Sequence, residues 1–150
     1  MRLTLLSGGQ TGVDRAALDA ALAAGVPVGG WCPAGRRAED GPIPARYPLR
    51  ETASADPAER TAANVRDADV LLVLAPGPPT GGTALAVETA HALGRPVWVA
   101  DPATDPAGPV LSWLRSQGGG LRLNVAGPRA SEWPGAYEAS IEWLGRVLGA

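Results

Sequence analysis

Lysine and phenylalanine are absent from this sequence, and cysteine and histidine each occur once. Without lysine the chain has no Walker-type P-loop, because that motif binds phosphate through its lysine. The single cysteine, Cys32, excludes an intrachain disulfide and fits a reducing compartment, so we expect a cytoplasmic protein. One cysteine and one histidine, His91, do not form a metal-ligand pattern or a Ser-His-Asp triad, so neither is predicted.

An excess of one charge and long apolar runs are also missing. The formal net charge is −2, so no general affinity for nucleic acid is predicted. The apolar runs are too short for a membrane span or a signal peptide, and we expect no membrane association. A chain of 150 residues can bury about two-thirds of its unfolded surface, which predicts a single domain over residues 1–150.

Strand-like and helical segments alternate along the chain. Continuous apolar runs predict strands over residues 3–7, 28–31, 69–75, 96–100 and 121–125. Helical periodicity and terminal glycines or prolines predict helices over residues 13–24, 58–68, 83–93, 109–117 and 135–148. Asp56 is the expected N-cap of the second helix, with Pro57 at its first position. Residues 32–56 show no clear period and are expected to form a long ordered loop.

Strands that are apolar along their whole length are typical of a parallel sheet with helices on both faces. We therefore predict an α/β fold, a three-layer doubly wound parallel sheet of about five strands. In such sheets the ligand binds outside the carboxyl ends of the strands. The loops that follow the strands are thus the first candidates for a binding site.

The stretch LLSGGQTGVDRAALDAAL places a glycine-rich turn between the first strand and the first helix. Glycines let backbone N–H groups approach a ligand, and a helix N-terminus attracts anions, so this turn predicts a phosphate site. The alternative is a tight turn with a helix cap and no ligand. The candidate binding residues are Ser7, Gly8, Gly9, Gln10, Thr11, Gly12 and Arg15.

A second glycine loop, in APGPPTGGTALAVETA, follows the strongest predicted strand. Gly81 and Gly82 would present backbone donors at the start of a helix, with Thr80 or Thr83 as its cap. If the two strands are neighbours, the two loops converge on one ligand. Glu88 lies one to two turns into this helix, where it points either into the site, as an acid/base or ribose ligand, or into solvent.

The third candidate is GGWCPAGRRAEDGPIPARYPLRET, residues 29–52. Trp31 offers a flat stacking face, and Arg36 and Arg37 offer forked donors for phosphate or carboxylate. Long loops in compact domains are usually functional. The alternative is a structural Ω-loop in which Glu39 and Asp40 pair with these arginines.

Four stretches carry a resemblance to a known family: SGGQTGVDRAALDAAL, GWCPAGRRAEDGPIPARYPL, RTAANVRDAD and TGGTALAVETA. They resemble the molybdenum carrier family of the LOG-like Rossmann superfamily, closely over residues 3–100 and more loosely beyond. The resemblance implies a Rossmann-like fold, a homo-oligomer (dimer or tetramer) and a crevice for a phosphorylated pterin or nucleotide, with molybdenum cofactor (molybdopterin) as the ligand. By motif it implicates Ser7–Gly12, Trp31–Arg36 and Gly81–Thr83.

Two functions from different classes remain open. The first is a molybdenum cofactor carrier that holds a phosphorylated pterin or nucleotide without chemistry; a nucleotide sensor belongs to the same binding class. The alternative is a LOG-like phosphoribohydrolase that cleaves the N-glycosidic bond of a nucleoside monophosphate with Glu88. Cytokinin-activating members of that superfamily share the signature P-G-G-x-G-T-x-E-E, in which Glu88 falls on the second glutamate and Val87 on the first. Because one signature carboxylate is missing, binding is favoured over catalysis.

The helix expected over residues 83–93 is apolar on most of its sides. Helices of this kind are usually buried on two fronts. One front must be the sheet, and we expect the other to be the same helix, or its neighbour, in a second subunit. The composition therefore predicts at least a two-fold dimer.

Overall fold

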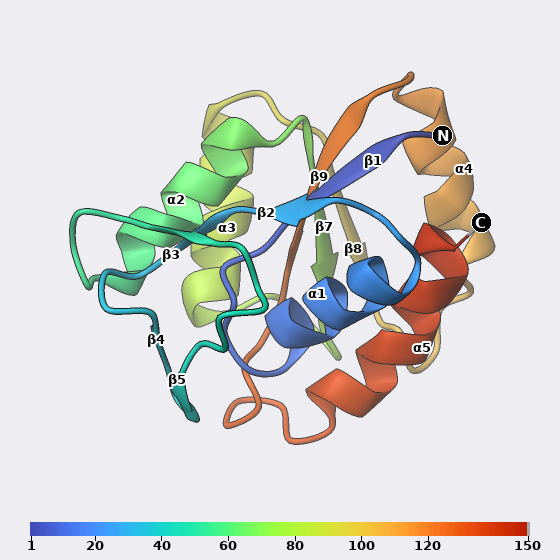
Figure 1. The fold of residues 1–150 in the computed structure, drawn as a ribbon. Coiled ribbons are helices and arrows are strands. Elements are labelled where there is room, and N and C mark those ends of the chain that lie inside the picture. The colour runs from blue at the N-terminus through green and yellow to red at the C-terminus, as the bar shows by residue number, and fades with distance from the viewer. Residues whose placement is uncertain (150) are drawn as a thin grey trace.

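The computed structural model describes residues 1–149 and contains a five-stranded parallel sheet at its centre (Figure 1). The strands lie in the order β2-β1-β9-β7-β8. Their bounds are β1 (Leu3–Leu6), β2 (Val28–Gly29), β7 (Val70–Leu74), β8 (Val97–Ala100) and β9 (Leu121–Ala126). Every pairing in this sheet is parallel, as the sequence predicts.

Helices cover both faces of the sheet. They are α1 (Val13–Ala23), α2 (Pro57–Asp67), α3 (Gly81–Ala92), α4 (Gly108–Ser116) and α5 (Ala136–Leu148). Helices α1, α4 and α5 pack on one face, and α2 and α3 pack on the other (Figure 1). The predicted three-layer doubly wound architecture is confirmed. The predicted N-cap of α2 is also confirmed, because the Asp56 side chain accepts a hydrogen bond from the amide of Ala58.

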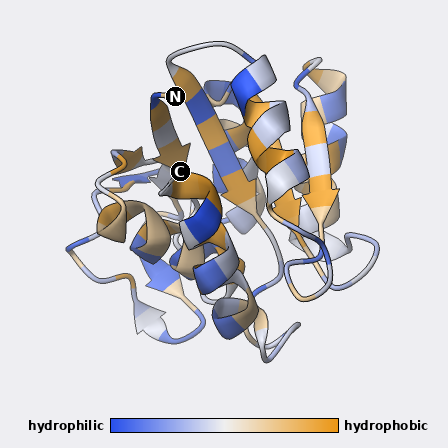
Figure 2. Cartoon of the chain, turned by 90° about the vertical axis from the view of Figure 1, so that its right-hand side faces the viewer, coloured by the Kyte–Doolittle hydropathy of each residue, from blue (hydrophilic) through white to orange (hydrophobic). Residues whose placement is uncertain are grey.

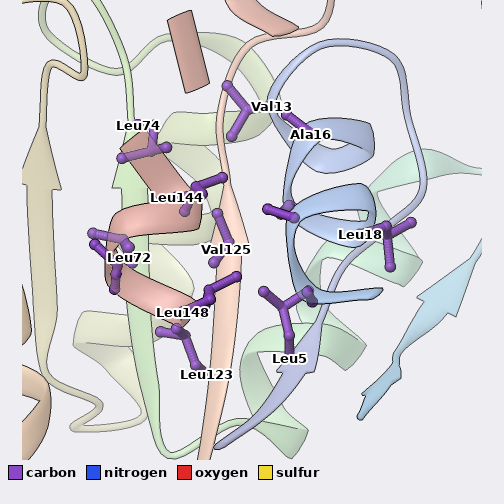
Figure 3. Packing of buried hydrophobic residues seen from close by; sticks show 14 of the residues in the cluster. Leu5, Val13, Ala16, Leu18, Leu72, Leu74, Leu123, Val125, Leu144 and Leu148 are labelled. Carbon is purple, nitrogen blue, oxygen red and sulfur yellow. The ribbon is translucent and has the colours of Figure 1, made fainter. Parts of the chain in front are cut away.

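The apolar strands fill the space between the two helical layers. On β7, Leu72 and Leu74 belong to the core beneath α1, α4 and α5, while Leu71 and Val73 belong to the core beneath α2 and α3. Figure 3 shows the larger core, with Leu144 and other side chains of α5 beside the strands. Hydrophobic residues accordingly dominate the central strands in Figure 2, whereas the loops are more polar. Burial on both faces explains why β7 is apolar at every position.

The long loop predicted for residues 32–56 contains short strand pairs. β3 (Trp31–Cys32) pairs in parallel with β6 (Arg50–Glu51), and β4 (Arg37–Ala38) pairs antiparallel with β5 (Gly41–Pro42). The expected strand 28–31 is divided at Gly30, which has φ +121° and lies so close to Ser7 that a Cβ would be 2.4 Å from its carbonyl oxygen. A side chain at position 30 would therefore collide with the backbone of Ser7, the residue that follows β1.

The sheet order separates the two strands that carry the glycine loops. β9 lies between β1 and β7, in register Leu5 to Leu123 and Leu72 to Val125. The two glycine loops therefore lie on either side of the end of β9 and not next to each other.

Within residues 1–149, none of the helices has the length and apolarity needed to cross a bilayer.

Candidate functional site

A cleft of about 460 Å³ opens at the carboxyl edge of the sheet, where the ends of β1 and β9 meet the N-termini of α2 and α3. This volume lies in the range of small-molecule sites. Its lining residues are Gly8, Gln10, Asp14, Asp56, Pro57, Ala58, Arg60, Thr61, Asn64, Gly81, Gly82, Thr83, Leu85, Ala86, Asn124, Val125, Ala126, Gly127, Arg129 and Glu132. Two of the three predicted loops thus contribute to one cleft, at the edge expected for a ligand.

The glycine-rich loop after β1 is held by its own side chains. The amide of Gly9 donates to Ser7 Oγ at 3.2 Å, and the amide of Gln10 donates to Asp14 Oδ2 at 3.3 Å. The amide of Thr11 donates to the side-chain carbonyl of Gln10 at 3.0 Å. The sequence predicts that these backbone amides bind an anion. In the structure, the amides of Gly9, Gln10 and Thr11 instead donate to side chains of the loop and of α1.

The N-terminus of α3 presents backbone donors to the cleft. Gly81, at φ +52°, and Gly82 both line it, and their amides donate to no acceptor within residues 1–149. The carbonyl of Thr80 accepts from the amides of Thr83 and Ala84 at 3.1 and 3.2 Å. The Thr80 side chain makes no capping bond, so the expected hydroxyl cap is not formed. The open donors and the positive end of the helix dipole suit an oxyanion.

Arg60 brings a guanidinium into the cleft from the first turn of α2. Its Nη1 lies 3.3 Å from Asp14 Oδ2, and its side chain is 17% exposed. Burial raises the pKa of Asp14 above its usual value, and the charge of Arg60 partly opposes this effect. One turn along α2, Asn64 accepts from the amide of Trp31 at 2.7 Å and donates to its carbonyl at 2.9 Å. These contacts fix α2, and with it Arg60, against the strands.

Arg129 supplies a second guanidinium, from the segment between β9 and α5. Its Nε lies 3.4 Å from Glu132 and 3.7 Å from Glu39. Hydrogen bonds from the hydroxyls of Ser131 and Thr11 lower the pKa of Glu39. Three segments of the chain therefore meet beside the cleft: the first glycine loop, the β4–β5 ribbon and the segment after β9.

Three predicted side chains are directed elsewhere. Arg15 donates to the carbonyl of Gly9 at 3.1 and 3.2 Å and to the carboxylate of Asp40. Arg36 donates to four backbone carbonyls of residues 43–49, which makes it a structural clamp for its own loop. The Trp31 indole donates to Asp67 at 2.8 Å. None of these three residues lines the cleft, and neither do Ser7, Gly9, Thr11 and Gly12.

Glu88 lies outside the cleft as well. It lines a separate groove of about 870 Å³ between α2 and α3, together with Trp31 and Leu85. Residues of α2 and α3 line both hollows, but the cleft lies at the start of α3, at Thr83 and Ala86, whereas the groove lies further along this helix, from Leu85 to Leu93. Of the two orientations that the sequence leaves open for Glu88, the structure places it at the surface, away from the cleft.

Sequence reasoning missed the contributions of α2 and of the end of β9. A helix that precedes a parallel strand begins at the edge where that strand ends, so the Asp56-Pro57 start of α2 was a signal that Arg60 reaches this edge. Asn124 is the single uncharged polar residue in the apolar run of β9, and its Nδ2 donates to the carbonyl of Leu6 at 3.0 Å. Arg129 follows β9 and gave no comparable signal.

The circularly permutated YpsA SLOG family matches residues 5–148 of the chain. The chain belongs to this family. A crystal structure described as that of a putative molybdenum carrier protein from Syntrophus aciditrophicus SB is 37% identical, with a TM-score of 0.89 over 98% of this chain and 94% of its own. No curated protein matches the chain.

The SLOG family match confirms the resemblance drawn from the sequence motifs. The matched range contains every residue that lines the cleft, from Gly8 to Glu132. Within residues 1–149, no group of three or more His, Cys, Asp or Glu side chains is placed to hold a metal ion. The fold is thus that of a SLOG protein, and the cleft lies within the matched residues.

Proposed function

We propose that this SLOG protein binds a phosphorylated small molecule, a nucleotide or a pterin, in the cleft. The main support for this proposal comes from the N-terminus of α3. There the amides of Gly81 and Gly82 have no acceptor within the described residues, and both glycines line the cleft. Arg60 and Arg129 add guanidinium groups that can pair with a phosphate in a forked geometry. Of the two glycine loops predicted to bind phosphate, the loop at the start of α3 therefore gives the proposal its main support.

The ligand that we favour is molybdenum cofactor, carried as cargo through its phosphorylated pterin. The similar Syntrophus protein, described as a putative molybdenum carrier, supports this choice. The cleft volume of about 460 Å³ suits a ligand of that size. Asn124 and Thr83, both largely buried, line the same cleft and offer polar groups to a heterocycle.

We propose that the ligand is held without chemistry. The alternative hydrolase needs Glu88, which lines the groove instead of the cleft. The carboxylates that do line the cleft are engaged: Asp14 pairs with Arg60, Glu132 pairs with Arg129, and Asp56 caps α2. Asp14 Oδ2 is occupied by Arg60 and by the amide of Gln10, and Glu132 lies in its ion pair with Arg129, so these contacts hold the carboxylates in place rather than leaving them free to approach a substrate as an acid or base.

Calorimetric titration with AMP, adenosine, a phosphorylated pterin and molybdate tests this proposal. We expect AMP and the phosphorylated pterin to bind at least tenfold more tightly than adenosine, a difference of about 1.4 kcal/mol. Equal affinity for AMP and adenosine would contradict the phosphate site. Release of adenine from AMP, detected by chromatography and lost in Glu88→Ala, would contradict the carrier function and support the alternative hydrolase.

We also propose a homo-oligomer, with the groove between α2 and α3 as the contact. Leu93, which is 44% exposed, lines this groove together with Leu85 and three alanines, Ala62, Ala63 and Ala92, so apolar side chains of both helices meet there. Ala86, by contrast, is buried against the chain's own sheet, so a bulky residue there would disturb the core. We expect sedimentation velocity to show a dimer that dissociates in Leu93→Asp but not in Val99→Asp, an exposed position on β8. A monomeric wild type at high micromolar concentration would refute the contact.

A further inference from the structure

A second hollow, the side cavity, adjoins the cleft. It has a volume of about 160 Å³ and lies between the glycine loop, the start of α2 and the loop after β3. Gly8, Gln10, Pro57 and Arg60 line both hollows, so Arg60 borders the cleft on one side and the side cavity on the other.

The charge of the side cavity differs from that of the cleft. Its ionisable lining residues are Arg37 and Arg60, and none of the carboxylates within residues 1–149 lines it. The cleft, in contrast, is lined by Asp14, Asp56 and Glu132 as well as by its arginines. Within residues 1–149, the Arg37 side chain makes no ion pair, whereas Arg60 has one, with Asp14. The side cavity therefore holds more positive charge than its surroundings neutralise.

Arg60 is held in place and retains an unused donor. A Cβ on Gly8 would lie 2.1 Å from Arg60 Nη1, which shows that the guanidinium lies directly against the glycine backbone. Arg60 Nε is buried and has no hydrogen-bond partner within the described residues. A buried donor without an acceptor is costly, and arginine satisfies such donors best with a planar or tetrahedral anion.

We propose that the side cavity is a second anion subsite, which takes a phosphate or carboxylate group between Arg37 and Arg60. The inference rests on the proposed function, because it describes a ligand whose first phosphate lies at the N-terminus of α3. The ligand class is then a molecule with two separate negative groups, such as a nucleotide or pterin that carries a second phosphate or a carboxylate. Neutral nucleosides lack both anchors.

Tungstate, a tetrahedral oxyanion with a strong anomalous signal, tests the two positions separately. We expect two tungstate ions per chain in soaked crystals, one at Gly81–Gly82 and one between Arg37 and Arg60. In Arg37→Ala the second ion disappears and its calorimetric affinity falls at least tenfold, while the first ion stays. Arg115→Ala is the matched control, because it removes an exposed arginine charge on α4, away from both hollows.

The possible results separate this inference from the proposed function. A side cavity without tungstate in the wild type, or an affinity that Arg37→Ala and Arg115→Ala lower equally, overturns the subsite even when tungstate occupies α3. Absence of tungstate at Gly81–Gly82 contradicts the proposed function instead. Displacement of the side-cavity ion by phosphate but not acetate assigns the group as phosphate, and the reverse assigns it as carboxylate.

Discussion

The substitution Gly82→Asp tests whether the N-terminus of α3 binds a phosphate, because it adds a negative charge there without a steric clash. A Cβ at Gly82 meets no atom within 4 Å, and its φ is not positive. Gly82→Ala and Gly82→Asp should therefore both fold. A carboxylate near a helix N-terminus is stabilising by roughly 0.3–1 kcal/mol, so the aspartate favours the fold while it repels an anionic ligand.

The expected loss of affinity follows from Coulomb's law. Two unit charges about 4 Å apart repel by about 1 kcal/mol in water and by about 4 kcal/mol at an effective dielectric constant of about 20. The cleft is open to solvent at the exposed residues Gly81 and Gly82, which favours the lower part of this range. We expect Gly82→Asp to weaken AMP binding by about 1.4–3 kcal/mol, roughly tenfold to 150-fold.

Calorimetry at constant low ionic strength is the assay, since added salt screens this repulsion. Gly82→Ala controls for the loss of glycine itself and should bind AMP within about threefold of the wild type, a change of less than 1 kcal/mol. Thermal unfolding of all three proteins verifies the fold. If Gly82→Asp binds AMP as tightly as Gly82→Ala, the phosphate lies elsewhere and the assignment to α3 is refuted.

Three further predictions concern the framework around the cleft. Gly127→Ala places a Cβ 2.3 Å from the Leu74 carbonyl oxygen, so urea unfolding should show a loss of about 1–3 kcal/mol, whereas Gly145→Ala, with open space on α5, should gain about 0.5–1 kcal/mol. Arg36→Ala removes hydrogen bonds to four backbone carbonyls, so hydrogen exchange by mass spectrometry should accelerate in residues 43–49; unchanged rates would contradict the clamp. The lowered pKa of Glu39 means that its stabilising contribution exists above its unfolded pKa and disappears as the pH falls through the folded value. The wild type should therefore lose more stability on acidification than Glu39→Gln, and parallel urea midpoints from about pH 5 to pH 3 would contradict this.

The sequence was most informative where burial imposes a pattern. β7 lies inside the sheet, between β9 and β8, and is buried at every position, so its unbroken apolar run identified a strand covered on both faces. Asp56 and Pro57 marked the start of α2 because capping depends on neighbouring residues alone. Local signals of this kind predicted the elements and the layered architecture.

Strand order could not be predicted in the same way, because it depends on contacts between distant segments. β9 pairs with both β1 and β7, and no local signal placed the last strand between them. The direction of long side chains was equally inaccessible. Arg15 and Arg36 have the chemistry of phosphate ligands, but nearby backbone carbonyls take their donors instead. Arg60 and Arg129 are the arginines that line the cleft instead.

The position of β9 has a consequence for how the chain is made. β1 is synthesised well before its pairing partner β9, in which Leu121 lies opposite Leu3. Until β9 is synthesised, β1 and β7 each expose an unpaired edge, which is a template for association with other chains. The cleft shares this late assembly, since Asn124, Gly127 and Arg129 belong to it. A nascent chain halted before residue 121 would therefore contain both glycine loops and still lack the strand that joins them into one site.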